Sequence, residues 1–239
     1  WADTLTVGAS NTPHAEILEQ AKPILAKQGI DLEIKPFQDY ILPNTALAGH
    51  DIDANYFQHI TYLNNFNAEN GTHLVSVADV HYEPFGIYAG KSDSLDELAD
   101  GAEVLVPNDV TNEARALLLL QDQGLLTLKE DAGLTATIND ITENPKNLEF
   151  SELEAPQLPR ALEDADIAII NMNFALEAKL DPKSAIYSEG SDSPYANIVA
   201  VREGDENRPE LQKLMKALTS KEVKDFIEKK YGGSVKTVF

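Results

Sequence analysis

The order of hydrophobic and polar residues predicts alternating strands and helices in the first part of the chain. Residues 5–8 and 31–35 have strand-like patterns, and residues 14–27 form an amphipathic helical pattern that Gly29 would end. A helix around residues 43–48 and a strand at 51–54 follow. This β-α-β-α-β order is typical of a parallel sheet. We then expect a helix from Gln58 through Asn67 and extended segments at 75–82 and 85–88.

A second, similar unit begins near residue 103. Its predicted strands are residues 103–107, 136–138, 148–153 and 167–170, and its predicted helices are residues 112–123 and 158–164. The run at 167–170 is entirely apolar, so we expect it to be buried on both faces of a sheet. An extended stretch at 196–201 and helices at 209–218 and 221–230 complete the chain.

No low-complexity linker separates these two units, which suggests two lobes. The pattern of strands and helices supports two such units. The crossovers would lie near residues 81–84 and 193–195. This arrangement predicts an α/β protein with a ligand cleft between its lobes, where hinge closure would trap the ligand.

Composition narrows the possible functions. The 239 residues are 43% hydrophobic and 25% charged, which is ordinary for a globular protein with a substantial core. The 40 acidic and 19 basic residues give a net charge of -21, so we expect no nucleic-acid partner. The absence of cysteine excludes disulfides, thiolate metal ligands and a cysteine nucleophile.

The first group of candidate binding residues is aromatic: Tyr40, Phe57, His59 and Tyr62. Rings gathered at the carboxyl end of a strand in an α/β protein commonly border a ligand site. His59 and Tyr62 would share a helix face with Phe66. Such a pocket suits a flexible, polarizable side chain, because sulfur–ring contacts add to apolar burial. The alternative is that the rings are core and that His59 is a structural histidine.

The second group lies where a predicted helix begins. Thr111 or Asn112 would cap this helix, and Arg115 would lie in its first turn. Free amide groups, the helix dipole and a planar guanidinium together favour a carboxylate ligand. The alternative is that Arg115 pairs with Glu113 or with another acidic residue on the surface.

The third group consists of two asparagines at strand ends, Asn171 and Asn197. A carboxamide oxygen accepts a hydrogen bond from a ligand ammonium without placing a full charge in the site. The alternative is turn chemistry, in which the asparagine side chain bonds to its own backbone.

Several motifs along the chain carry a family resemblance. They are DYILPN at 39–44, DIDAN at 51–55, PND at 107–109, ENPKNL at 143–148, ELEAPQLPR at 152–160 and SPYAN at 193–197. With these motifs the chain resembles the NlpA family of methionine-binding lipoproteins (MetQ type), which serve bacterial ATP-binding-cassette (ABC) importers. The resemblance implies a two-lobed, type II periplasmic-binding-protein-like fold with a discontinuous first lobe, in which residues 1–82 and 195–239 form one lobe and residues 83–194 the other.

The resemblance also implies a ligand site. In this family aromatic residues and a histidine surround the ligand side chain, an arginine binds the carboxylate, and asparagines bind the amine. By position these are Tyr40, Phe57, His59 and Tyr62, then Arg115, then Asn171 and Asn197, with Asn112 joining at the helix start. Two segments depart from the family: the loop at 9–14, which varies among relatives, could alter the mouth of the cleft, and the rings in the segment at 82–85 could reshape the pocket.

The implied function is capture of methionine, foremost L-methionine, and its delivery to an ABC transporter permease. A methionine-containing dipeptide such as Gly-Met is the alternative ligand. Family members are extracytoplasmic and are held to the membrane by a lipid on an N-terminal cysteine, which is absent from this chain. The membrane anchor is therefore an inference from the family.

Two other function classes are less well supported. The sequence contains no nucleophile elbow, metalloprotease motif, phosphate loop or dinucleotide fingerprint, so we expect neither an enzyme with catalytic residues nor a cofactor. A metal-binding receptor could use His59, His73, His81 and Glu83. These residues have no regular spacing, and an arginine at the site would oppose a cation, so we expect no metal.

Overall fold

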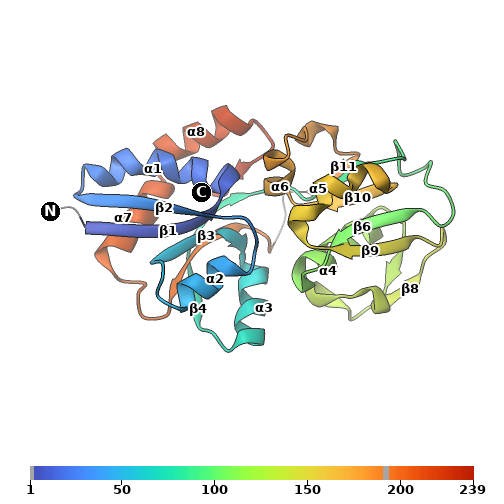
Figure 1. Ribbon diagram of the computed structural model, residues 1–239, viewed down its shortest axis with the longest axis horizontal. Helices are drawn as coiled ribbons and strands as arrows, with labels where there is room; N and C mark the ends of the chain where they lie inside the picture. Colours follow the sequence, from blue (N-terminus) through green and yellow to red (C-terminus); the bar gives the residue numbers. More distant parts are fainter. Residues whose placement is uncertain (1–2, 191–193) are drawn as a thin grey trace. The chain divides into compact units, whose positions relative to one another are not determined.

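The computed structural model describes residues 3–190 and 194–239. The chain forms two compact units: residues 1–83 with 192–239 form unit 1, and residues 84–191 form unit 2 (Figure 1). Glu83 and Pro194 belong to unit 1, whereas the division predicted from the sequence placed them in the second lobe. Trp1, Ala2 and Ser193, the first residue of the SPYAN motif, lie outside the described residues. No helix within those ranges combines the length and apolar character needed to cross a membrane.

Unit 1 is built on a six-stranded sheet. Its order is β13 (Lys236–Thr237), β4 (Leu74–Tyr82), β12 (Asn197–Arg202), β3 (Ala54–His59), β1 (Asp3–Ser10) and β2 (Ile30–Phe37). Strand β1 pairs in parallel with β2 and β3, as predicted, whereas β12 is antiparallel to both β3 and β4. The chain therefore returns to the first sheet after it has built unit 2.

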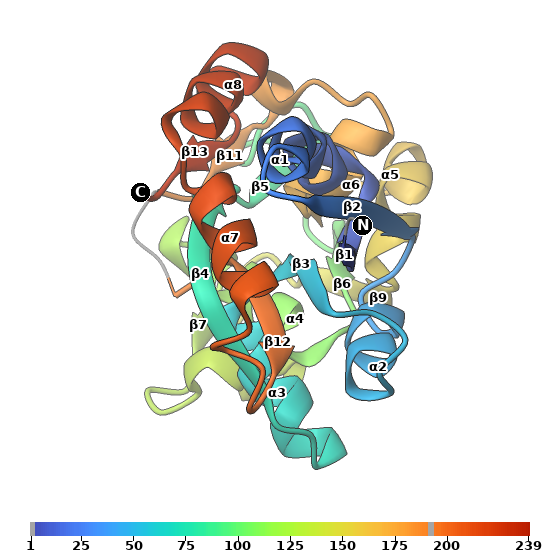
Figure 2. The same ribbon diagram turned by 90° about the vertical axis from the view of Figure 1, so that its left-hand side faces the viewer.

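Helices cover both faces of this sheet (Figure 2). They are α1 (Glu16–Ala26), α2 (Leu42–Ala48), α3 (Ile60–Asn70), α7 (Pro209–Leu218) and α8 (Lys221–Tyr231). Helix α1 packs against β2, α7 and α8, and helices α2 and α3 pack against β3. The amphipathic pattern explains this packing, because α1 buries Ile17, Leu18, Ala21 and Leu25 on one face.

A buried carboxamide network holds α2 against β3. The Asn44 side chain donates to Gln58 Oε1 at 2.9 Å, and Asn44 Oδ1 accepts from Asn55 at 2.8 Å and from Gln58 at 2.8 Å. Asn55 also donates to the carbonyl of Pro43 at 3.0 Å. Because all three side chains are buried, each needs these partners. The DYILPN and DIDAN motifs therefore contain residues with a clear structural role.

Unit 2 contains a five-stranded sheet with the order β11 (Tyr187–Ser188), β5 (Gly86–Ala89), β10 (Ile167–Ile170), β6 (Glu103–Pro107) and β9 (Glu149–Leu153). Its helices are α4 (Val110–Asp122), α5 (Leu158–Ala161) and α6 (Met172–Glu177), and β7 (Thr127–Leu128) pairs with β8 (Ile141–Glu143). Short helical turns lie at Gly133–Thr135, Ile138–Asp140, Ala155–Gln157, Leu162–Asp164 and Pro182–Ser184. As predicted, every residue of β10 is buried.

Several predicted elements differ from the structure, among them two strands and the start of α4. The strand predicted at 51–54 is wrong: β3 begins at Ala54, and Asp53 instead accepts a hydrogen bond from the backbone of Thr6 at 2.9 Å. The strand predicted at 136–138 is also wrong, because a capping box between Thr137 and Asp140 forms a 3-10 turn there. Helix α4 begins at Val110 with Asp109 as its N-cap, so Arg115 lies beyond the first turn.

Candidate ligand site

Five segments of unit 1 meet at one edge of its sheet. Strands β1, β2 and β3 run in parallel, so their carboxyl ends lie at the same edge. Strand β12 begins at this edge and β4 ends there, because Asn197 pairs in register with His59 and with His81. The residues that follow β1 and β2 therefore lie at the same edge as Asn197, His59 and His81.

The predicted aromatic residues come together at this edge. The Tyr40 ring centroid lies 6.0 Å from that of Phe57 and 6.0 Å from that of Tyr62, and the Phe57 and Tyr62 rings are 5.9 Å apart. The Tyr62 hydroxyl donates to the backbone carbonyl of Tyr40 at 2.5 Å. The sequence-based prediction missed Tyr195, whose ring lies 4.9 Å from His59, although the SPYAN motif contains this residue.

His59 has a structural role as the N-cap of α3. The backbone N–H of Tyr62 donates to His59 Nδ1 at 3.0 Å, so Nδ1 is an acceptor and the proton of the neutral ring is on Nε2. The helix therefore begins at Ile60, and the prediction that His59 lies within the helix is wrong. The cap fixes the orientation of the imidazole next to the aromatic rings.

Asn197 contacts a buried polar cluster of His14, His81 and Glu83, of which the sequence analysis named His81 and Glu83 but not His14. His14 lies in the short helical turn η1 (Asn11–Ala15) after β1, and its Nε2 is 2.7 Å from Asn197 Oδ1. His14 Nε2 also lies 3.1 Å from Glu83 Oε2, and His81 Nε2 lies 2.6 Å from the same oxygen. Both histidines are fully buried. The sequence signal for this cluster was the position of two histidines, His14 and His81, near the ends of predicted strands.

The donor atoms of His14, His81 and Glu83 all lie within 4.8 Å of one another, a spacing that a metal ion could use. His59 and His73 do not join a group of this kind in the described part of the chain. Burial raises the pKa of Glu83, but the two imidazoles outweigh this effect and hold the pKa well below its usual range. Glu83 is thus an ionised acceptor for two imidazole N–H groups, which accounts for the cluster without a metal.

In unit 2, the corresponding edge brings Arg115, Phe85 and Glu189 together. The antiparallel register pairs Gly86 with both Ile170 and Ser188, so the residues that flank them lie at one end of β5. Arg115 Nε donates to Glu189 at 3.0 and 3.1 Å, and its Nη2 also contacts Glu189 Oε1. The guanidinium carbon lies 4.6 Å from the centroid of the Phe85 ring.

Arg115 pairs with an acidic residue in this structure, and that residue is Glu189. Arg115 is buried, with 5% of its side chain exposed, and 14% of the Glu189 side chain is exposed. A bidentate partner and an aromatic face hold the guanidinium in one orientation. Glu189 was not predicted, because the sequence separates it from Arg115 by 74 positions.

The predicted asparagines of unit 2 differ in their contacts. The Asn112 side chain donates to Asp109 Oδ2 at 2.6 Å, at the N-terminus of α4. Asn171 follows β10 directly and is the N-cap of α6, but its side chain makes no capping hydrogen bond. Its Oδ1 is buried and has no hydrogen-bond partner among the described residues. A buried, unpaired acceptor of this kind is costly unless a ligand supplies the donor.

Glu113 lies in the first turn of α4 and has an altered pKa. Burial, followed by the neighbouring Glu152 and Asp109 carboxyls, raises the pKa of Glu113 to about 8. The folded protein therefore holds a proton that the unfolded chain releases near pH 4.5. Binding this proton stabilises the folded protein; the stabilisation is complete below about pH 4.5 and is lost as the pH rises through about 8.

We expect Glu113→Gln to be more stable than the original chain at pH 8.5, by about 1–2 kcal/mol, and to lose this advantage at pH 4.5. Glutamine keeps the side-chain shape but cannot ionise. Urea unfolding across this pH range measures the difference. Glu130→Gln removes an exposed carboxyl and is the control. Parallel pH profiles for Glu113→Gln and the original chain would contradict the prediction.

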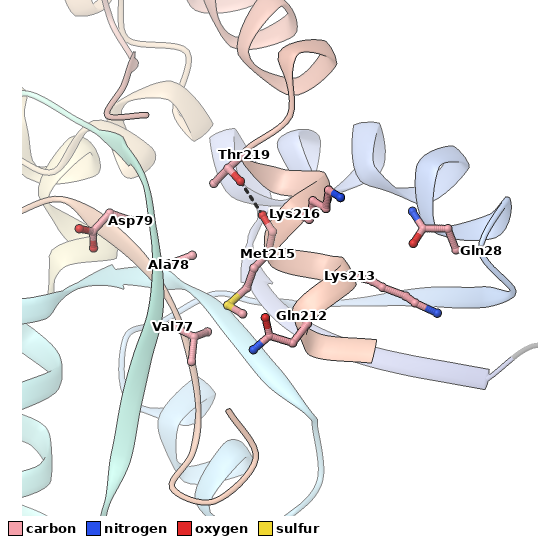
Figure 3. Close-up of a pocket in the computed structure, with 9 residues that line it drawn as sticks. All are labelled: Gln28, Val77, Ala78, Asp79, Gln212, Lys213, Met215, Lys216 and Thr219. Carbon is pink, nitrogen blue, oxygen red and sulfur yellow. Dashed lines mark hydrogen bonds between the residues drawn. The ribbon is translucent and has the colours of Figure 1, made fainter. Parts of the chain in front are cut away.

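A separate pocket of about 630 Å³ lies between β4 and α7 of unit 1 (Figure 3). Val77, Ala78 and Asp79 line it from the strand, and Met215 and Lys216 line it from the helix. Figure 3 shows Thr219 bonded to the carbonyl of Met215 at its upper rim. None of the predicted ligand-binding residues lines this pocket. The aromatic and polar groups described above lie elsewhere.

Comparisons with known proteins place the chain in a family. Residues 5–239 match the model of the NlpA lipoprotein family. The chain belongs to the NlpA lipoprotein family. The D-methionine-binding lipoprotein MetQ of Escherichia coli O157:H7 is 45% identical, over 97% of this chain and 88% of that protein. The predicted family is therefore confirmed.

Two solved structures are also similar to the chain. A nutrient-binding protein from Burkholderia cenocepacia, bound to methionine, has a TM-score of 0.95 and 45% identity, covering 98% of this chain and 100% of that one. A periplasmic substrate-binding protein of an ABC transporter from Coxiella burnetii has a TM-score of 0.93 and 42% identity, covering 98% and 99%. The predicted α/β binding-protein fold is confirmed.

Proposed function

We propose that this NlpA family member is an extracytoplasmic solute-binding protein that captures methionine and delivers it to an ABC transporter permease. The observation that carries the proposal is the likeness to the methionine-bound Burkholderia protein, which extends over nearly the whole chain at 45% identity. The Coxiella relative supports the transporter as partner. In this role the protein performs no chemistry, and its partners are a small ligand, the permease and, through a lipid anchor, the membrane.

The aromatic edge of unit 1 is suited to the methionine side chain. Phe57 and Tyr62 are buried and Tyr40 is half-buried, so a thioether between these rings would exchange water for apolar and sulfur–ring contacts. The imidazole of His59, which the N-cap hydrogen bond holds in one orientation, adds a polar group beside the Tyr62 ring. The proposed role of the four residues is to bind the ligand side chain.

Arg115, Asn171 and Asn197 are proposed to bind the charged end of the amino acid. Arg115 is held by Phe85 and Glu189, so its guanidinium is ordered before a ligand carboxylate arrives. The unpaired Oδ1 of Asn171 is an acceptor for the ligand ammonium. Asn112 is proposed to act indirectly: its side-chain amide donates to Asp109 and so holds the start of α4 in place.

The ligand identity is tested by denaturing the purified protein and analysing the released small molecules by mass spectrometry. The emptied protein is then titrated calorimetrically with L-methionine, D-methionine and Gly-Met. We expect released methionine and tight rebinding of a methionine enantiomer. Both enantiomers are needed, because our proposal favours L-methionine whereas the Escherichia coli relative is named for D-methionine.

The possible results separate the alternatives. Tight binding of Gly-Met alone would replace the amino acid by a dipeptide and would require a longer site. Binding of none of the three ligands would contradict the methionine proposal, even though the family assignment would stand. A parallel titration with Zn²⁺ tests the metal-receptor alternative, which predicts a stoichiometric complex.

A further inference from the structure

The buried cluster in unit 1 has a hydrogen-bond order that its chemistry determines. Glu83 is ionised and can only accept, so the Nε2 atoms of His14 and His81 that face Glu83 Oε2 must both carry protons. A protonated His14 Nε2 in turn requires an acceptor at 2.7 Å, which identifies the facing Asn197 atom as Oδ1. The orientation of the Asn197 carboxamide follows from this chain of donors and acceptors.

The remaining ring nitrogens agree with this order. His14 Nδ1 is buried and has no partner among the described residues, as an unprotonated nitrogen tolerates better than an N–H group does. His81 Nδ1 contacts the hydroxyl of Tyr56. Burial lowers the pKa of His81, so its ring is neutral and the Tyr56 hydroxyl donates to Nδ1. The sequence of bonds is Tyr56 to His81 to Glu83, with His14 donating to both Glu83 and Asn197.

The cluster lies where β4 and β12 meet. Asn197 pairs in register with His81, and Glu83 follows β4 directly. Other titratable groups nearby are on α8 and α1: Tyr231 donates to Glu16 at 2.6 Å, and this pair neighbours η1 through Thr12, which donates to Glu16 at 2.6 Å. Tyr231, Glu16 and Thr12 thus bond to one another. The contact between the cluster and the Asn197 side chain is made by His14.

We propose that His14 is a positioning residue for ligand binding: with Glu83 as its anchor, it fixes the Asn197 carboxamide so that one oxygen lone pair and the amide N–H₂ face the ligand. This inference rests on the proposed ligand role of Asn197. The Asn197 amide nitrogen makes no hydrogen bond with a described residue, so it is available as a donor to a ligand carboxylate. Asn197 therefore offers both a donor and an acceptor to an amino acid.

A double-mutant cycle tests the positioning role. His14→Phe keeps a planar ring but removes the donor, and we expect it to weaken methionine binding about tenfold or more, as measured by calorimetry. In an Asn197→Ala background the same substitution should change the affinity less than about twofold. His14→Gln keeps an N–H donor and should retain most of the affinity. Equal losses in both backgrounds would mean that His14 acts only on general stability, and would overturn the proposal.

A second measurement requires neither a ligand nor a variant. Nitrogen-15 NMR of the original chain reports which ring nitrogen is protonated, and we expect Nε2–H for both His14 and His81. An unprotonated His14 Nε2 would overturn the proposed bond order. If the protein bound no methionine, the calorimetry would reject the proposed function, while the NMR result would still decide the hydrogen-bond order. The two failures are thus distinguishable.

Discussion

Replacing Arg115 by alanine should weaken methionine binding by about 2–5 kcal/mol, because the ligand carboxylate would be left without its charged partner in a buried site. Arg115 is 5% exposed, so water could not take over this role fully. Tyr62→Phe should cost much less, since it keeps the ring and removes one hydrogen bond to the carbonyl of Tyr40. Calorimetric titration of both variants with methionine measures the difference.

The Arg115 experiment needs a control for Glu189, which loses its ion-pair partner in the alanine variant. Glu189→Gln with Arg115 intact removes the ion pair but keeps the guanidinium. If the ligand contact is what matters, Glu189→Gln should retain far more affinity than Arg115→Ala does. Circular dichroism establishes that each variant is folded. Equal, negligible losses for Arg115→Ala and Tyr62→Phe would show that the assigned site is wrong.

Gly90→Ala should lower the free energy of unfolding by about 3 kcal/mol or more. A Cβ atom at position 90 would overlap the backbone carbonyl oxygens of Ala165 and Leu162, which cannot rotate away as a side chain can. The same backbone is tied by hydrogen bonds from Gly90 to Asp166 at 3.0 Å and from Lys91 to Ala165 at 2.8 Å. The clash must therefore displace the segment that leads into β10, which Asn171 follows.

Gly233→Ala is the matched control for this substitution. A Cβ atom there would meet no atom within 4 Å, and the residue does not have a positive φ angle. Urea unfolding should place Gly233→Ala close to the original chain and Gly90→Ala well below it. Similar midpoints and slopes for the two variants would show that the contact at Gly90 relaxes at little cost.

Local pattern predicted most of the elements around the site. The runs that become β1, β6, β10 and β12 have the apolar character of buried strands, and α1, α7 and α8 show the helical periodicity. The predicted strand at 51–54 failed because Asp53 makes a distant contact with Thr6, which no local pattern contains. The helix start predicted near Gln58 was misplaced, because the hydrogen bond from the Tyr62 backbone makes His59 the N-cap and Ile60 the first helical residue.

The sequence alone determined the family, the alternation of strands and helices and the aromatic set, since these depend on residue types and spacings along the chain. Tertiary structure alone decided which partners the polar residues have. Arg115 and Glu189 are 74 positions apart, and His14 and Asn197 are 183 apart, yet each pair is joined by hydrogen bonds. Strand pairing creates these contacts, because it brings the ends of distant strands to one edge of a sheet.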